Sequence, residues 1–451
     1  MIVARDTDWR SEEENARSTK RRRSAGESNT TDLRDFYDQI ASGHVNGQIR
    51  SSWLAILHRI SMHNRDSGIV QPNMEVSAAI KSLSRQLIQA KRRLWPAAER
   101  CAEVTGSRPE REFGEARRFC NPMEPLGEGN QGGLNQMFMN RAAIKLANID
   151  AILGFALTQV NSENFFFADL CGAPGGFSEY LLKRSQETRT SGFVRGYGMS
   201  LVGTNEHGHG TGWNLGHINH QNLSYQVSGG ADGSGDIYNS ENVKALSRGI
   251  EYDMHFSKLR PQKMHLVVAD GGFDAQRNSE CQEELATKLI LCEIAAAMYL
   301  LQQGGTLVIK MFGFQTNTIR VAMRDLFDFF DELTILKPIS SRPASAERYV
   351  VCKGYRGMRD FDGTEWMNSV FLRRVTPQDK MRYAQFDNKL DEFDMDLLQL
   401  NLKACFAILS LLERKAAAQS SWQISMQGGG APWDSELPPL NVEFYRQAWR
   451  L

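Results

Sequence analysis

The sequence predicts an α/β protein built on a mostly parallel sheet. Strand-like and helix-like segments alternate between Asn135 and Tyr355, which is the pattern of successive βαβ units. The chain has 451 residues, of which 41% are hydrophobic and 24% charged, so it can bury one large core or two smaller ones. This composition argues against a disordered or fibrous protein.

The expected strands are short apolar runs bounded by turn residues. They lie at 164–170, 193–201, 264–270, 306–310 and 348–354. An amphipathic segment from Glu283 to Gln303 predicts a helix that stops at the Gly304–Gly305 pair. The segment from Val202 to Asn242 is rich in Gly, Asn, Ser and His, so we expect a long loop, and loops of this length often serve function.

Helical patterns flank this region on both sides. Residues 31 to about 103 are predicted to be helical, with apolar residues three and four positions apart at Val76, Ile80, Leu83 and Leu87. The basic run 91–93 near the end of that helix is interpreted as favourable charge at a helix C-terminus, in preference to an RNA contact. A further helix is expected over 397–415.

These patterns divide the chain into four predicted parts. Residues 1–30 form a disordered basic tail, 31–115 a helical N-terminal extension, 116–356 the α/β domain, and 357–451 a C-terminal helical extension and tail. The basic run Lys20–Arg23 fits a nuclear localisation signal, an RNA-touching arm or a solvated tail, and the sequence leaves these alternatives open.

Charge and cysteine usage restrict the class of protein. Fifty-three basic and 53 acidic residues give no net charge, so a nucleic-acid surface has to come from local clustering. The seven cysteines are scattered and never spaced as CxxC, which favours free thiols in a reducing compartment over a zinc ribbon or a disulfide scaffold. No apolar run approaches a membrane span and the N-terminus is too charged for a signal peptide, so we expect a cytosolic or nuclear protein with no membrane partner.

A glycine-rich turn follows the first expected strand in the stretch FFFADLCGAPGGFSEY. In α/β sheets, ligands bind at such turns, at the carboxyl ends of the strands. Gly172, Gly175 and Gly176 allow a close approach to the backbone, and Pro174 stiffens the turn. The turn has neither the lysine of a phosphate-binding loop nor the GxGxxG spacing of a dinucleotide site, so it suits a neutral or cationic adenosine ligand.

Charged residues end two other apolar strands. Asp270 follows VVA and Lys310 follows TLVI, so both side chains are expected at the same carboxyl edge of the sheet. Lys145 lies on the helix before the first strand. A lysine that ends a buried strand is unfavourable unless it is solvated, paired or used in chemistry.

Five ordered motifs carry a resemblance to a known family. They are FMNRAAIKLANID, DLCGAPGGFSEY, VADGGF, LVIKMF and KPISSRPASAERYVVCKG, and the similar region covers about Arg117 to Gly354. The chain resembles the FtsJ-like ribose 2′-O-methyltransferases, and most of all the eukaryotic and viral branch that methylates the first transcribed nucleotide beside the mRNA cap. The resemblance implies a Rossmann-like S-adenosylmethionine-dependent methyltransferase sheet flanked by helices. It also implies a catalytic tetrad of Lys145, Asp270, Lys310 and Glu347.

The chemistry of methyl transfer gives these four residues roles. A ribose 2′-hydroxyl is a poor nucleophile, so it needs a nearby base, and we expect Lys310 to be that base. Its pKa would have to fall toward neutral, through burial and the positive charge of Lys145. Asp270 and Glu347 are expected to orient the two ammonium groups, and the cluster should titrate as a coupled group. No metal is required, and a metal site in the histidine-rich segment 207–220 is not expected.

The resemblance also assigns residues to the cofactor and the substrate. S-adenosylmethionine would contact the following residues: Asn140, Cys171, Gly172, Ala173, Pro174, Gly175, Gly176, Phe177, Asp236 and Ile237. The RNA would contact a second set: Arg117, Arg118, Glu280, Cys281, Gln282 and Ser345. Ser345 stands where the cap enzymes commonly have an asparagine, and its hydroxyl is shorter than that amide.

The sequence therefore predicts an S-adenosylmethionine-dependent 2′-O-methyltransferase of capped mRNA. We expect a nuclear protein, with a cytoplasmic location as the alternative, and the transcription or capping machinery is a candidate partner. Two other functions stay open: 2′-O-methylation of ribosomal or transfer RNA, and an inactive RNA-binding subunit that keeps the fold.

Overall fold

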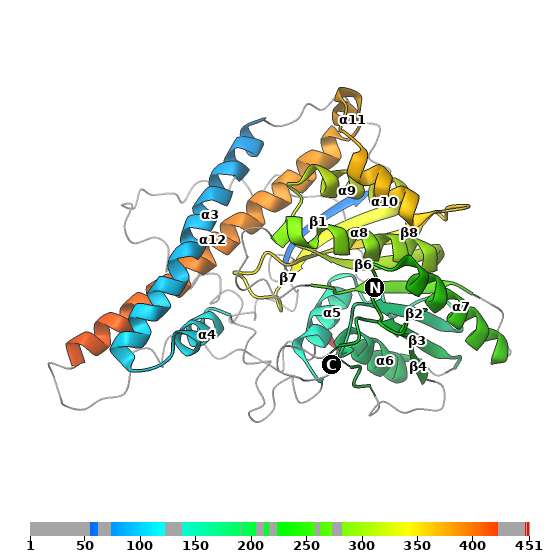
Figure 1. Cartoon of the computed structure of the whole chain (residues 1–451), viewed down its shortest axis with the longest axis horizontal. Helices are drawn as coiled ribbons and strands as arrows, with labels where there is room; N and C mark the ends of the chain where they lie inside the picture. The colour runs from blue at the N-terminus through cyan, green and yellow to red at the C-terminus, as the bar shows by residue number, and fades with distance from the viewer. Residues whose placement is uncertain are drawn as a thin grey trace.

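The computed structural model describes residues 55–61, 74–121, 138–189, 191–203, 212–215, 223–257, 262–272, 282–422, 447, 449 and 450. Within these residues, an eight-stranded sheet lies between layers of helices (Figure 1). The strands are β1 (Ala55–Ser61), β2 (Phe165–Leu170), β3 (Val194–Met199), β4 (Leu223–Val227), β5 (Met264–Ala269), β6 (Leu301–Met311), β7 (Phe330–Pro338) and β8 (Arg348–Tyr355).

Some of the described helices cover the two faces of the sheet, and others belong to the N- and C-terminal extensions. They are α3 (Met74–Thr105), α4 (Pro109–Phe119), α5 (Arg141–Ile152), α6 (Gly176–Thr188), α7 (Ser240–Phe256), α8 (Gln282–Leu300), α9 (Asn317–Phe329), α10 (Gly363–Leu372), α11 (Pro377–Arg382) and α12 (Ala384–Trp422). The predicted α/β fold class with helical extensions is confirmed.

The sheet has the order β1-β7-β8-β6-β5-β2-β3-β4. The five strands from β4 to β6 are parallel, whereas β8, β7 and β1 join antiparallel. The sheet is therefore mixed, and the expectation of a mostly parallel sheet holds only for one half of it. The antiparallel half matters for the site, because β8 enters the sheet at the edge where β6 ends.

Three strands differ from the sequence prediction. The strand β1 lies in a segment that was expected to be helical, and β4 lies in the segment 202–242 that was expected to be a loop. The strand β7 begins directly after α9 with no intervening turn residue, so the sequence gives no boundary between them. In addition, α8 ends at Leu300 and β6 begins at Leu301, ahead of the glycine pair that we expected to end the helix.

Alternating side chains of the strands build a core on each face of the sheet. Phe166 and Ala168 face the helices α7 to α10 and the first half of α12, whereas Phe165 and Phe167 face α5, α6 and Trp449. Every residue of β2 is buried, as expected for a central strand covered on both faces.

The two extensions pack against each other. The helix α3 lies along α12 at one side of the sheet, and α4 packs beside both (Figure 1). The helix α3 continues through Pro96 to Thr105, so the basic run 91–93 lies inside the helix. Our interpretation of this run as charge at a helix C-terminus is therefore wrong.

The helix α12 starts at Ala384, thirteen positions before the predicted helix 397–415. Its segment Ala384–Ala417 is the one described helix that is long and apolar enough to cross a membrane, with a mean hydropathy of 1.5 in its most apolar window. The buried apolar side chains of α12 pack against the sheet and against α3.

Several predicted features lie outside the described residues. These are the tail 1–30 with Lys20–Arg23, the histidine-rich segment except 212–215, Glu280 and Cys281. The boundaries of the four predicted parts stay a prediction.

Buried ion pairs should dominate the anchoring of α12. Arg348 and Asp394 form an ion pair in which both side chains are at most 4% exposed. Because removing one partner leaves an uncompensated buried charge, Asp394→Ala should lower the free energy of unfolding by about 3–5 kcal/mol. The exposed pair of Arg356 and Asp331 provides the control, and Asp331→Ala should change it by less than about 1 kcal/mol. Urea denaturation measures both, and equal losses would contradict the expectation.

Candidate active site

The four predicted tetrad residues meet at the carboxyl edge of the parallel strands. Asp270 follows β5 directly, Lys310 is the penultimate residue of β6, and Lys145 lies on α5. Glu347 immediately precedes β8, which pairs antiparallel with β6 so that Tyr349 stands opposite Lys310. This register places the start of β8 beside the end of β6, so Glu347 lies near Lys310.

The tetrad consists of two lysine–carboxylate pairs. Lys145 Nζ lies 2.8 Å from Glu347 Oε2. Lys310 Nζ lies 3.0 Å from Asp270 Oδ1 and donates to the Asp270 backbone carbonyl at 2.6 Å. The same Asp270 oxygen accepts the hydroxyl of Tyr349 at 2.9 Å, so Asp270 is held from two sides. All four tetrad side chains are between 10% and 16% exposed, which shields them from water but leaves an open side.

The charges in this cluster stabilise one another. Burial alone would raise the pKa of Glu347, but Lys145, Lys310 and Lys337 outweigh it and hold that pKa far below its usual range. Burial alone would lower the pKa of Lys310, but Asp270 and Glu347 outweigh burial and raise it. The expected fall of the Lys310 pKa toward neutral is therefore wrong, because two carboxylates face this lysine and stabilise its charged form.

A fifth charged residue, Lys337, lies beneath the cluster and was missed by sequence reasoning. It is 2% exposed and ends the apolar run of β7, the same signal that marked Lys310. Its ammonium donates to the backbone carbonyls of Ser345 and Glu347, both at 2.9 Å, and to Ser341 Oγ at 3.1 Å. Burial lowers the pKa of Lys337 to about 7. Lys337 thus fixes the loop 339–347 that carries Glu347.

The glycine turn has the close packing that its composition predicts. A Cβ on Gly172 would lie 2.0 Å from Asp169 Oδ1, and one on Gly176 would lie 2.1 Å from Asn140 Oδ1. Gly175 adopts φ +109°, a conformation that strongly favours glycine. Asn140 caps α5 by accepting the backbone N–H of Ala142 at 2.9 Å. The same side chain lies against Gly176, the first residue of α6.

Buried carboxyl groups surround the turn. Burial raises the pKa of Asp169 to about 7, and its Oδ1 has no hydrogen-bond partner among the described residues. Glu293 on α8 accepts the backbone N–H of Gly271 at 3.0 Å, and burial raises its pKa to about 8. Burial, with the nearby Glu293 and Asp169, also raises the pKa of the Cys171 thiol well above its usual range. Glu293 was not predicted, although a lone acid in the apolar segment LILCEIAAAM is a signal that could have found it.

The second predicted cofactor segment lies at the same edge. Gly235, next to Asp236, packs so closely on Ser200 after β3 that a Cβ would lie 1.9 Å from the Ser200 carbonyl oxygen. Asp236 accepts the backbone N–H of Tyr238 at 2.8 Å, and Ile237 is buried. Trp213 and Leu215 pack over Gly175, a contact that the sequence did not predict.

The predicted substrate residues come from three elements. Arg117 and Arg118 lie in the last turn of α4, and Arg117 stacks over the ring of Phe113 at 5.5 Å. Gln282 is the first residue of α8. Ser345 accepts the backbone N–H of Glu347 through its hydroxyl at 3.2 Å, so it shapes the turn that presents Glu347. Among the described residues, no group of three or more His, Cys, Asp or Glu side chains could hold a metal ion.

The chain was compared with curated proteins and solved structures. It is 32% identical over 275 residues to the cap-specific mRNA (nucleoside-2′-O-)-methyltransferase 1 of Drosophila melanogaster, covering 58% of this chain and 32% of that protein. It is 31% identical over 272 residues to the human protein of the same name, covering 57% of this chain and 30% of that protein. The chain thus spans about a third of the length of these relatives.

Among solved structures, a putative ribosomal RNA methyltransferase from Plasmodium falciparum matches with 19% identity and a TM-score of 0.33, over 49% of this chain and 99% of that one. The family model described as FtsJ-like methyltransferase matches residues 138–355, the segment that contains the sheet from β2 to β8 and all four tetrad residues. Residues 138–355 of this chain therefore match the FtsJ-like methyltransferase family.

Proposed function

We propose that the chain transfers a methyl group from S-adenosylmethionine to the ribose 2′-hydroxyl of the first transcribed nucleotide of capped mRNA. The observation that carries this proposal is the pair of lysine–carboxylate contacts beside a glycine turn, at the carboxyl edge of an FtsJ-like sheet. The substrate is inferred from the relatives, which are named cap-specific mRNA methyltransferases. We propose a nuclear location on the same ground.

The residues around the glycine turn fit the cofactor. Its glycines let the side chains of Asp169, Asn140 and Trp213 pack directly on the backbone of the turn, and the turn has no lysine that would attract a polyphosphate. The buried carboxyl of Asp169, with one oxygen unpartnered among the described residues, suits a ligand that carries positive charge. Asn140 and the segment 171–177 would hold the amino-acid end, and Asp236 with Ile237 would meet the adenine.

Each tetrad residue has a distinct task in this reaction. S-adenosylmethionine supplies a methyl group on a cationic sulfur, which becomes a neutral thioether on transfer. Lys310 removes the proton of the 2′-hydroxyl as the oxygen forms its bond to the methyl carbon. Asp270 holds the Lys310 ammonium at 3.0 Å and thereby fixes the position of its nitrogen. Glu347 pairs with Lys145 through Oε2 at 2.8 Å and thereby orients the Lys145 ammonium.

The proton transfer requires Lys310 to lose its charge. The carboxylates of Asp270 and Glu347 raise the pKa of Lys310. A cationic ligand at the glycine turn would lower that pKa by charge repulsion, because like charges disfavour each other's ionised form. The base would therefore become active when the methyl donor is present.

Methyl transfer to matched RNAs tests the proposed substrate. Labelled S-adenosylmethionine is supplied with capped and uncapped RNAs of the same sequence, and the methylated nucleotide is located after nuclease digestion. We expect the label on the first transcribed nucleotide of the capped RNA alone. Equal labelling of both RNAs would overturn the cap assignment and leave the reaction class intact.

Removal of the proposed base should stop turnover without emptying the cofactor site. Lys310→Ala should reduce kcat by at least about 100-fold, the contribution of a positioned general base. The dissociation constant for S-adenosylmethionine, measured by calorimetry, should stay within a few-fold. Lys263→Ala is the control, because Lys263 is exposed and precedes β5 at the opposite edge of the sheet. Turnover near the wild-type rate in Lys310→Ala would eliminate Lys310 as the base.

The raised pKa of Lys310 predicts an alkaline pH profile. The neutral amine is a minor form at pH 7, and its fraction grows about tenfold for each pH unit below the pKa. The kcat/KM for S-adenosylmethionine, at saturating RNA, should therefore rise with a slope near one between about pH 7 and 9. The kcat profile should level off at a lower pH, because the bound cation lowers the Lys310 pKa. A flat kcat/KM profile over this range would contradict the assignment.

A further inference from the structure

The helix α12 lies outside the segment that matches the family model, yet it is fixed to the catalytic domain by buried charges. Asp387, Asp391 and Asp394 recur at spacings of four and three, so they lie on one face of the helix. They pair with Arg324 and Arg320 of α9 and with Arg348 of β8, respectively. This row of three ion pairs aligns α12 with the edge of the sheet where the site lies.

The last of these pairs reaches the site itself. Arg348, which follows Glu347, donates to the Ala346 carbonyl at 3.1 Å and to the Phe312 carbonyl after β6 at 3.2 Å. Asp394 holds the opposite side of this guanidinium. The arginine therefore ties α12 to the residues on both sides of the lysine–carboxylate cluster.

Asn401 continues the same face of α12, seven positions after Asp394. Its amide is 1% exposed and donates to the backbone carbonyls of Pro343 at 2.5 Å and of Ser345 at 3.0 Å. The Ser345 carbonyl also accepts from Lys337, so the loop 339–347 is held from two elements at one point. Ala344 in this loop packs against the cluster formed by α3, α4 and α12.

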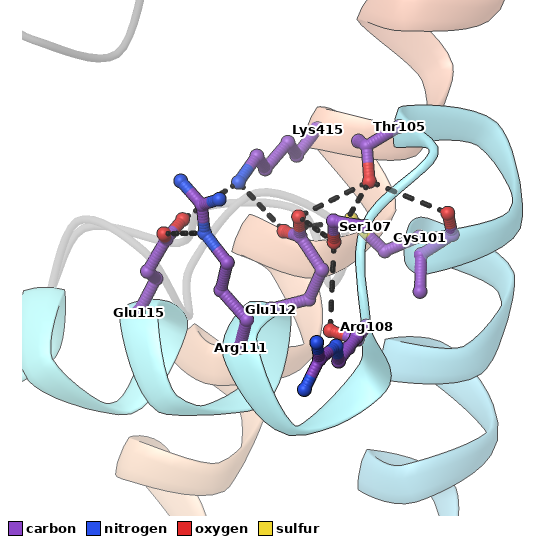
Figure 2. Close-up of polar contacts among 9 residues, drawn as sticks. Cys101, Thr105, Ser107, Arg108, Arg111, Glu112, Glu115 and Lys415 are labelled. Atoms are coloured by element: carbon purple, nitrogen blue, oxygen red, sulfur yellow. Dashed lines mark hydrogen bonds and ion pairs between the residues drawn. The ribbon is translucent and has the colours of Figure 1, made fainter.

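The far part of α12 holds a different segment. Lys415 contacts Glu112 Oε2 at 2.6 Å and Glu115 Oε2 at 2.9 Å, both on α4. Figure 2 shows Glu112 between Lys415 and the turn that joins α3 to α4, where Ser107 Oγ donates to Glu112 Oε1 at 2.6 Å. Burial alone would raise the pKa of Glu112, but the contacts with Lys415 and Ser107 outweigh it and lower that pKa.

We propose that α12 is a strut that sets the spacing between the two segments predicted to touch the RNA, with Asn401 and Lys415 as positioning residues. Asn401 holds the loop that carries Ser345 and Glu347, and Lys415 holds the helix that carries Arg117 and Arg118. The two positioning residues stand fourteen places apart (401 to 415), which is about 21 Å along a helix. This inference rests on the proposed function, because it assigns the held segments to RNA.

The strut predicts different kinetic effects at its two ends. The loop 339–347 carries a residue of the tetrad, and a displacement of about 1 Å in a catalytic group can reduce the rate by about 100-fold. The helix α4 carries two arginines that would bind phosphate, so its displacement weakens binding and leaves the reacting groups in place. Loss of the first contact should lower kcat, and loss of the second should raise KM for RNA.

The first arm of the experiment uses Asn401→Leu, which keeps the branched shape of the side chain and removes both amide N–H donors. We expect kcat to fall by at least about tenfold, with the S-adenosylmethionine dissociation constant unchanged. Asp391→Asn is the matched control, because Asp391 lies on the same face of α12, is 7% exposed and pairs with Arg320 away from the loop. It should lower the melting temperature and leave kcat within about twofold. An equal fall of kcat in both variants at matched folded fraction would overturn the role of Asn401.

The second arm uses Lys415→Ala beside Lys415→Arg. The alanine variant removes the contacts of Lys415 with Glu112 and Glu115 and should raise KM for RNA about tenfold, with kcat within about twofold. The arginine variant keeps the charge opposite Glu112 and should restore most of the affinity. Glu413→Gln removes the exposed neighbouring pair with Arg93 and should change neither constant. A KM for RNA in Lys415→Ala equal to the wild-type value would overturn this end of the strut.

Both arms use the full chain and whichever RNA the wild-type protein methylates best. If that RNA is uncapped, the proposed substrate fails, but the split between kcat and KM is measured on it and still tests the strut. If the wild-type protein methylates the capped RNA, but Asn401→Leu does not lower kcat and Lys415→Ala does not raise KM, the proposal for α12 is overturned and the proposed function stands. Methyl transfer to no RNA would overturn both proposals.

Discussion

The carboxyl edge of the sheet holds two ammonium groups and two carboxylates under partial burial, and the site depends on their mutual neutralisation. A single charge at this depth would be strongly unfavourable, so each lysine requires its carboxylate within hydrogen-bond distance. The ends of β5 and β6, the start of β8 and the helix α5 must therefore meet within a few ångströms. The mixed topology of the sheet satisfies this requirement, because antiparallel β8 begins where parallel β6 ends.

Two parts of the site could be predicted from the sequence: the neighbouring ends of the parallel strands and the glycine turn. Parallel strands end at a common edge, so an aspartate after one apolar strand and a lysine at the end of another were expected to be neighbours. Asp270 and Lys310 are in contact in the structure. The glycine turn was likewise recognisable, because its residues exclude the other common nucleotide loops. Lys145 and Glu347 were placed by the family resemblance, since no spacing in the sequence relates a helix before β2 to a loop before β8.

The features that could not be predicted depend on contacts between residues far apart in the sequence. The spacing of apolar residues does not predict such contacts. The strand β7 has no turn residue before it. The edge strands β1 and β4 mix apolar and polar residues, AILHRIS and LSYQV, in a pattern that does not separate them from a helix or a loop. The acidic residues of α12 form no recognised motif in the sequence, and only the fold brings three arginines of α9 and β8 against them. The Lys310 pKa was expected in the wrong direction, because the sequence does not report how closely Asp270 and Glu347 face this lysine.

The protonation state of the Cys171 thiol decides whether this cysteine can be alkylated. It lies at the start of the glycine turn, where a sulfonium methyl donor is proposed to bind, and alkylation of a cysteine proceeds through its thiolate. Burial and the carboxyl groups of Glu293 and Asp169 raise the pKa of this thiol well above its usual range, so it stays protonated. The neutral Cys171 thiol would therefore not compete with the RNA hydroxyl for the methyl group of the proposed donor. The same acidic surroundings that would suit the proposed cationic donor also keep the Cys171 thiol protonated.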